Sequence, residues 1–141
     1  MATMARRDAV LDSSILIQHA RERDKRRSLF ARSLLAYQPH LSVISVYEIE
    51  FGAFRSGRIS DIDTLRSSFE FLPLTKAIAK RAARLDADLL RQNFQIGIKD
   101  IFIAATCLEH DLPLLTINTR HFARVPQIAL IDLKTLLQVS N

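Results

Sequence analysis

Three carboxylates stand where an apolar, strand-like run or a helix-capping residue gives way to a helix: Asp12, Glu48 and Asp100. Carboxylate oxygens, together with carbonyl and water oxygens, suit Mg²⁺ or Mn²⁺. Without a cation, carboxylates that lie close together repel one another, and one of them tends to take up a proton. If these three side chains meet in the fold, they therefore predict a metal-holding acidic pocket.

The net charge of the chain has the opposite sign to such a pocket. The 20 Lys and Arg side chains outnumber the 15 Asp and Glu side chains, which gives a formal net charge of +5. A positive surface attracts phosphate backbones or an acidic protein partner. Six basic residues lie between positions 20 and 35, where partner contact and a solvated surface are equally good interpretations: Arg21, Arg23, Lys25, Arg26, Arg27 and Arg32.

Length and composition predict one domain that spans residues 1–141. With 141 residues and 48% hydrophobic residues, the chain suits a single packed core. Its apolar stretches are shorter than a membrane-spanning helix, and its first residues lack the layout of a secretory signal. We therefore expect a soluble, cytoplasmic protein without a membrane contact. The single cysteine, Cys107, lies in an apolar helical pattern and is expected to be buried.

Several other chemistries have little support in the sequence. The chain has three glycines, and their spacing excludes both the dinucleotide-binding fingerprint and the phosphate-binding P-loop. The four histidines show no zinc-binding spacing, and His121 is interpreted as a surface residue. No serine lies in the elbow motif of serine hydrolases.

The first part of the chain predicts a strand followed by helices. Residues 9–11 form a short apolar run that ends at Asp12, and the following residues predict a helix. Residues 20–35 are helix-prone, and Pro39 is expected to close that helix. The chain is thus expected to open with a strand and a helix.

A second strand and helix follow. Residues 41–44 form another apolar run, and Ser45 with Glu48 matches the capping box that begins a helix. Gly57 lies near the expected end of this helix. Ser60 or Asp61 is expected to cap a further short helix before Phe69.

The second half of the chain continues the alternation of strands and helices. Residues 71–74 contain a proline and predict an edge strand, while residues 75–94 carry the apolar stripe of a long amphipathic helix. Gly97 separates this helix from the next, which starts beside Asp100. Residues 114–117 and 128–131 are apolar runs of strand length.

This alternation predicts an α/β fold, a three-layer α/β/α sandwich around a mostly parallel sheet of four or five strands. The carboxyl ends of parallel strands meet at one edge of such a sheet. We therefore expect Asp12, Glu48 and Asp100 to converge there, near Asn118.

The pattern also allows a purely structural interpretation of these acids. Asp12 and Asp100 are acceptable helix caps, and Glu48 is the expected partner in a capping box. Asp132 follows a strand as well, so position alone does not separate it from the others.

Three motifs in order resemble those of PIN-domain ribonucleases. These stretches are AVLDSSILI, SVISVYEIEFGAFRSG and IGIKDIFIAATCLEHDLPLLTINTRHF. The third is the most specific, with an aspartate before an Ile-Ala-Ala helix, then a strand and a Thr-x-Asn turn. Within that superfamily, the chain most resembles the VapC-type toxins of bacterial and archaeal toxin-antitoxin pairs.

The resemblance implies roles for particular residues. Asp12, Glu48 and Asp100 would be the metal ligands, and Asp132 would be only a helix cap. Asn118 falls on the fourth acidic position of many family members, so a second metal would be held more loosely or through water. The hydroxyls of Ser14 and Thr116 would support the ligands.

The resemblance further implies an Mg²⁺- or Mn²⁺-dependent endoribonuclease that cleaves RNA and acts as a toxin. It implies a homodimer and a small antitoxin partner. Two other interpretations remain at this stage. An aspartyl-nucleophile phosphatase would need a second acid where Ser14 stands. A non-catalytic, receiver-like or RNA- or protein-binding α/β module would use its acids as caps and bind through its basic surface.

Overall fold

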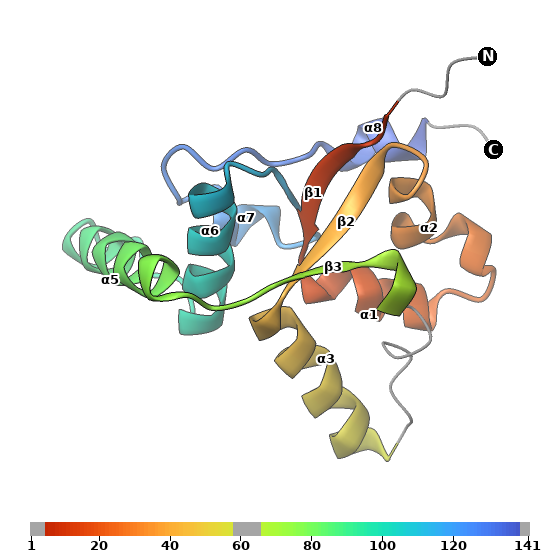
Figure 1. Cartoon of the computed structure of the whole chain (residues 1–141), viewed down its shortest axis with the longest axis horizontal. Helices are drawn as coiled ribbons and strands as arrows, with labels where there is room; N and C mark the ends of the chain where they lie inside the picture. The colour runs from red at the N-terminus through yellow and green to blue at the C-terminus, as the bar shows by residue number, and fades with distance from the viewer. Residues whose placement is uncertain (1–4, 58–65, 139–141) are drawn as a thin grey trace.

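The computed structural model describes residues 5–57 and 66–138, and it contains a parallel four-stranded sheet (Figure 1). The strand order is β3-β2-β1-β4, and each neighbouring pair is parallel. The strands are β1 (Arg7–Leu11), β2 (Tyr37–Ser42), β3 (Glu70–Leu72) and β4 (Leu114–Leu115). The predicted α/β class and mostly parallel sheet are confirmed, with β3 as the expected edge strand.

Helices connect these strands. They are α1 (Ser13–Arg21), α2 (Leu29–Ser33), α3 (Val43–Ser56), α5 (Lys76–Arg91), α6 (Ile98–His110), α7 (Thr119–Phe122) and α8 (Leu133–Leu137). Two short 3-10 helices are η1 (Lys25–Arg27) and η2 (Arg66–Ser68). Within the described ranges, no helix is long and apolar enough to cross a membrane.

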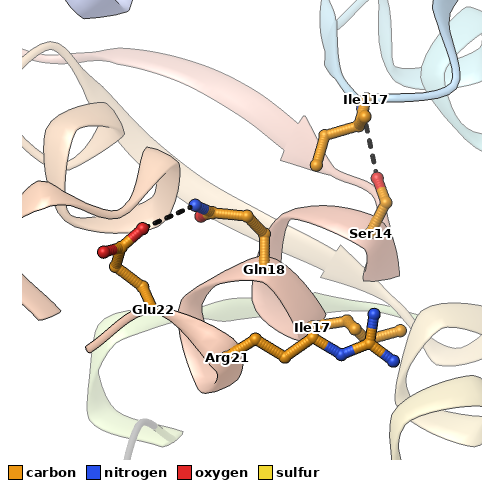
Figure 2. A pocket seen from close by; sticks show the side chains of 6 residues that line it. All are labelled: Ser14, Ile17, Gln18, Arg21, Glu22 and Ile117. Atoms are coloured by element: carbon orange, nitrogen blue, oxygen red, sulfur yellow. Dashed lines mark hydrogen bonds between the residues drawn. The ribbon is translucent and has the colours of Figure 1, made fainter. Parts of the chain in front are cut away.

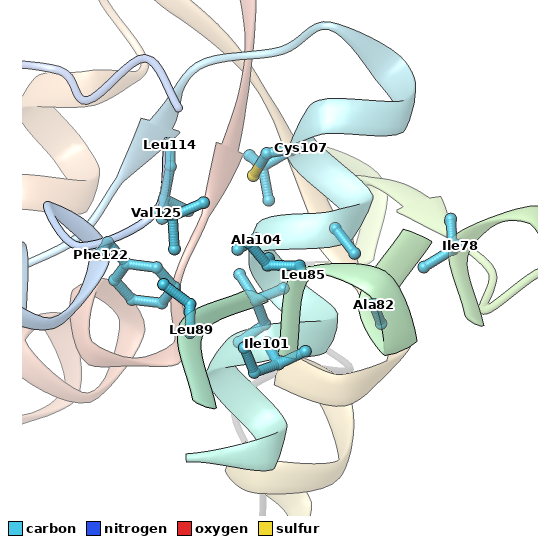
Figure 3. Packing of buried hydrophobic residues seen from close by; sticks show 13 residues of the cluster. Ile78, Ala82, Leu85, Leu89, Ile101, Ala104, Cys107, Leu114, Phe122 and Val125 are labelled. Atoms are coloured by element: carbon cyan, nitrogen blue, oxygen red, sulfur yellow. The ribbon is translucent and has the colours of Figure 1, made fainter. Parts of the chain in front are cut away.

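The core has two parts because alternate residues of a strand point to opposite faces of the sheet. Val10 of β1 packs with residues of α5 and α6 in one buried cluster. Figure 3 shows this cluster, in which Leu85 and Leu89 of α5 lie against Ile101 of α6. The neighbouring β1 residues Ala9 and Leu11 belong to the second cluster, which includes buried residues of α1, α2 and α8. The sheet is therefore covered on both faces.

The predicted continuous helix over residues 20–35 is wrong. The chain instead ends α1 at Arg21 and forms η1 and α2. The side chain of Asp24 accepts from the backbone N–H of Arg26, and that of Ser28 accepts from Ala31. Such short polar side chains compete with helical hydrogen bonding, so they start new helical turns here rather than continue the old one.

The second strand begins earlier than predicted. Pro39 does not close a helix but lies inside β2, opposite Ala9 of β1, and its ring is buried. The strand also ends earlier, at Ser42, and residues 43 and 44 belong to α3. Ser42 is the helix cap and accepts from the backbone N–H of Ser45 at 3.2 Å. The predicted capping box of Ser45 and Glu48 is consequently wrong.

The later elements follow the sequence more closely. Thr75 caps α5 within the expected 75–94 segment, and Gly57 ends α3 in the left-handed region with φ of 71°. Residues 128–131 contribute only an isolated bridge between Leu114 and Leu130, so the described sheet has four strands. The predicted capping positions Ser60 and Asp61 lie outside the described residues.

Candidate active site

Asp12 is fixed at the end of β1 by three hydrogen bonds. The residue is 2% exposed and caps α1. Its Oδ1 accepts from the backbone N–H of Ser13 at 2.9 Å. Its Oδ2 accepts from the hydroxyls of Ser14 at 2.9 Å and Thr116 at 2.7 Å. A carboxylate with these donors is held in one orientation.

The two hydroxyls also connect Asp12 to the segment after β4. The backbone N–H of Ile117 donates to Ser14 Oγ at 3.1 Å, a contact visible in Figure 2. The backbone N–H of Asn118 donates to Thr116 Oγ1 at 3.0 Å. Ser14 and Thr116 therefore hold the strand ends of β1 and β4 together around the carboxylate.

Glu48 lies in the second turn of α3 and faces the same network. The Ser13 hydroxyl donates to Glu48 Oε1 at 3.2 Å. Burial raises the pKa of Glu48, and the negative charge of Asp12 raises it further. The Ser13 hydrogen bond and the charge of Lys99 act in the opposite direction. Because Ser42 caps α3, the capping role does not explain Glu48.

Asp100 lies in the first turn of α6, whose cap is Gly97. Burial raises the pKa of Asp100, and the charge of Asp12 adds to this effect. His121 Nδ1 lies 3.6 Å from Asp100 Oδ2 and lowers the pKa of this carboxyl. Asp100 is therefore not a helix cap either, and its ionised form is disfavoured by the same neighbour that affects Glu48.

Three residues of this site were not singled out from the sequence. Ser13 contacts Glu48, and His121, although exposed as expected, lies beside Asp100. The ammonium of Lys99 lies 5.6 Å from the centre of the Tyr47 ring, between α6 and α3. The available signals were weak: Ser13 and Lys99 are direct neighbours of predicted ligands in the sequence.

Asn118 and Asp132 differ clearly from the three carboxylates. Asn118 is exposed at the start of α7, and its side chain makes no capping hydrogen bond within the described residues. Its backbone N–H joins the network around Asp12 by donating to Thr116 Oγ1. Asp132 caps α8 and accepts from the backbone N–H of Lys134 at 2.9 Å. Its capping role accounts for its position after an apolar run.

A family model described as the PIN domain matches residues 9–128. This chain belongs to the PIN-domain family. The matched range includes Asp12, Glu48, Asp100 and Asn118, and it ends before Asp132.

The PIN domain has relatives that carry the VapC name. It is 32% identical over 124 residues to Ribonuclease VapC1 of Rickettsia felis, a match that covers 82% of this chain and 89% of that protein. A match to Ribonuclease VapC of Rickettsia bellii is 34% identical over 67 residues. That match covers 48% of this chain and 50% of the relative. The resemblance to VapC-type proteins found in the motifs is thus confirmed.

Solved structures show the same fold. VapBC-1 from nontypeable Haemophilus influenzae has a TM-score of 0.77 at 24% identity and covers 90% of this chain and 98% of that one. A toxin-antitoxin complex from Klebsiella pneumoniae has a TM-score of 0.67 at 28% identity, with coverage of 86% and 95%. The similarity to the Haemophilus influenzae structure shows the fold. The Klebsiella pneumoniae structure has the same fold and a higher sequence identity to this chain.

The three carboxylates of this PIN domain, Asp12, Glu48 and Asp100, provide the oxygen ligands that a hard divalent cation prefers. Asp12 raises the pKa of both Glu48 and Asp100, so each of the two feels the same negative neighbour. A cation among them would relieve this repulsion. In the described part of the chain, however, no three His, Cys, Asp or Glu side chains are grouped closely enough to hold one ion. Shared coordination by all three therefore requires the side chains to move closer together.

Proposed function

We propose that this PIN domain is a metal-dependent endoribonuclease that cleaves RNA with Mg²⁺ or Mn²⁺. The observation that carries the proposal is the shared acidic site. Ser13 links Asp12 to Glu48 through its backbone N–H and its hydroxyl, and the charge of Asp12 adds to burial in raising the pKa of both Glu48 and Asp100. The capping interpretation does not account for Glu48 and Asp100. The relatives named as ribonucleases support RNA as the substrate.

The chain's own residues would contribute in different ways. Asp12, held by three donors, would be the fixed ligand, while Glu48 and Asp100 would complete the set. The neutral side chain of Asn118 would orient a water molecule at the exposed edge of the site. When bound, a divalent cation would activate water and neutralise charge on the transferring phosphate. Basic residues near the site would bind the RNA backbone.

We also propose that this nuclease is the toxin of a toxin-antitoxin pair in the cytoplasm. The support comes from the solved neighbour from Klebsiella pneumoniae, which is a toxin-antitoxin complex. The structure offers a surface for a protein partner on α3, where Tyr47, Phe51 and Phe54 are exposed. Phe54 is 80% exposed, and exposed apolar patches of this kind are typical of interaction sites. The expected homodimer stays a prediction.

The substrate class can be tested with a pair of labelled oligonucleotides of one sequence, one of RNA and one of DNA. Wild-type protein freed of antitoxin is expected to cut internal bonds of the RNA in Mg²⁺ and to leave the DNA intact. Asp100→Asn, purified identically, controls for contaminating nucleases. Equal RNA cleavage by both proteins would contradict the assignment, as would cutting of the DNA alone.

A further inference from the structure

A hollow of about 470 Å³ lies along α1, next to the candidate active site. We call it the α1 hollow, and its lining residues, drawn in Figure 2, are Ser14, Ile17, Gln18, Arg21, Glu22 and Ile117. Ser14 belongs to both places, because its hydroxyl donates to Asp12 Oδ2 at 2.9 Å. The hollow is therefore adjacent to the acidic site. Its volume lies within the usual range of ligand pockets, about 300–1,000 Å³.

The α1 hollow combines apolar side chains with one cation. Ile17 and Ile117 come from segments far apart in the sequence, and they are 39% and 42% exposed. Arg21 follows Ile17 by one helical turn. Figure 2 shows its side chain extended along Ile17, on the side away from Glu22. The hollow thus offers aliphatic surface and a guanidinium side by side.

The other polar groups of the hollow are already engaged. Gln18 Oε1 accepts from the backbone N–H of Leu29 at 3.0 Å, and Gln18 Nε2 donates to Glu22 Oε2 at 3.3 Å. The amide therefore holds the start of α2 and the Glu22 carboxylate. Arg21 is left as the cation that a ligand in the hollow would meet.

The six basic residues between positions 20 and 35 form what we call the basic segment. Two of its cations near the hollow have structural roles elsewhere. Lys25 Nζ donates to the carbonyls of His19 and Ala20 at 2.7 Å each, at the end of α1. Arg26 pairs with Asp24 at 3.2 Å. The basic segment is therefore not a uniform surface, and Arg21 is its member that lines the hollow beside the acidic site.

We propose that the α1 hollow binds the RNA nucleotide next to the cleaved phosphodiester, an inference that rests on the proposed ribonuclease function. Arg21 contacts a phosphate of this nucleotide, and a planar guanidinium suits phosphate oxygens. The base packs against Ile17 and Ile117, which are otherwise partly exposed to water. Arg21 is therefore a positioning residue that holds the strand across the acidic site. Because aliphatic packing does not read base edges, the subsite tolerates different bases.

The phosphate contact can be measured by RNA binding at several salt concentrations, with Asp100→Asn as the background so that the RNA stays intact. Adding Arg21→Gln is expected to reduce the slope of log K against log salt by about 0.7, the value for one phosphate contact to a single strand. Arg23→Gln is the matched control, because Arg23 belongs to the same basic segment but does not line the hollow. An equal slope change in both variants would overturn the proposal.

The base contact can be measured by a thermodynamic cycle. An RNA with an abasic site beside the cleavage position is expected to bind more weakly than the intact RNA. In Ile17→Ala this difference should shrink by more than about twofold, since two groups in contact are not independent. An unchanged difference would show that the base does not pack on Ile17.

These results separate the subsite from the function on which it rests. If wild-type protein cuts RNA, Asp100→Asn does not, and Arg21→Gln binds RNA as tightly as its parent, the subsite is wrong and the ribonuclease stands. If Arg21→Gln impairs antitoxin binding but not RNA binding, the hollow belongs to a protein partner and the proposal is overturned. If wild-type protein neither cuts nor binds RNA, both proposals are wrong.

Discussion

At the level of single residues, the three carboxylates are held in different ways. Asp12 is buried with three donors on its oxygens, so its charge is compensated by the fold. Glu48 accepts from the Ser13 hydroxyl, and His121 Nδ1 lies 3.6 Å from Asp100 Oδ2. The raised pKa values of Glu48 and Asp100 follow from burial and from the charge of Asp12. A bound cation would thus relieve the electrostatic repulsion on these two side chains.

This difference predicts how the metal-free protein responds to pH. Because both pKa values are raised in the fold, the folded state binds more protons than the unfolded chain between the ordinary and the raised values. The free energy of unfolding therefore falls as pH rises through that interval. Above it, both carboxyls are ionised in the folded state and the free energy of unfolding falls no further on their account. In EDTA, Asp100→Asn should unfold at a higher denaturant concentration than wild type at neutral pH, and its pH dependence should be weaker.

Asp132→Asn is the control for this experiment, because asparagine also caps helices well. Its denaturation midpoint should follow that of wild type across the whole pH range. A lower midpoint for Asp100→Asn than for wild type at neutral pH would show that the Asp100 charge stabilises the metal-free fold, contrary to the electrostatics described above.

At the level of secondary structure, a capping role by itself does not separate structural acids from functional ones. Asp132 caps α8 and Asp12 caps α1, yet only Asp12 lies in the acidic site. Asp132→Ala should lower the free energy of unfolding by about 1 kcal/mol, the usual value of a cap, and leave RNA cleavage unchanged. Asp12→Ala leaves the buried donors of Ser13, Ser14 and Thr116 without their acceptor, and it should cost about 1–3 kcal/mol for such donors and abolish cleavage. Urea unfolding and a cleavage assay on the same preparations would check both.

The parts of the fold that the sequence predicted are those with strong periodicity. The stripe of α5 and the apolar β1 run before Asp12 are decided by burial, which sequence patterns report directly. The start of α3 was missed because Ser42 and Ser45 are equally good caps in the sequence, and only the end of β2 chooses between them. Pro39 was misjudged because its burial in an inner strand depends on neighbours distant in the chain.

The candidate site was selected by motif resemblance rather than by periodicity. Motif resemblance selected Asp12, Glu48 and Asp100, while spacing alone could not distinguish them from Asp132. The contacts of Ser13 and His121 depend on side chains that meet only across separate helices. Such long-range pairs leave no local pattern, so a single sequence does not reveal them.

At the level of the whole molecule, the proposed toxin needs a partner surface as well as an active site. The exposed aromatic face of α3 is the strongest described candidate, and its Tyr47 and Phe51 rings stack on each other at 5.9 Å. Phe54→Asp should weaken capture of the proposed antitoxin by more than about tenfold, as expected for an apolar anchor in an interface. Because Phe54 is 80% exposed, the melting temperature should change little.

Ala83→Asp on the exposed surface of α5 is the matched control, since it adds the same charge to another helix. Its antitoxin binding should equal that of wild type. Equal binding by Phe54→Asp and wild type would instead remove α3 from the partner surface, while leaving the nuclease proposal untouched.

The most direct test of the central claim is the rate of RNA cleavage as a function of Mg²⁺ concentration, measured for wild type, Asp100→Asn and Asp132→Asn. The acidic site predicts a wild-type rate that is zero in EDTA and saturates with Mg²⁺. It predicts no cleavage by Asp100→Asn at any Mg²⁺ concentration and a wild-type curve for Asp132→Asn. Cleavage by wild type that persists in EDTA, or a curve for Asp100→Asn that matches wild type, would contradict the claim that these carboxylates hold the metal on which RNA cleavage depends.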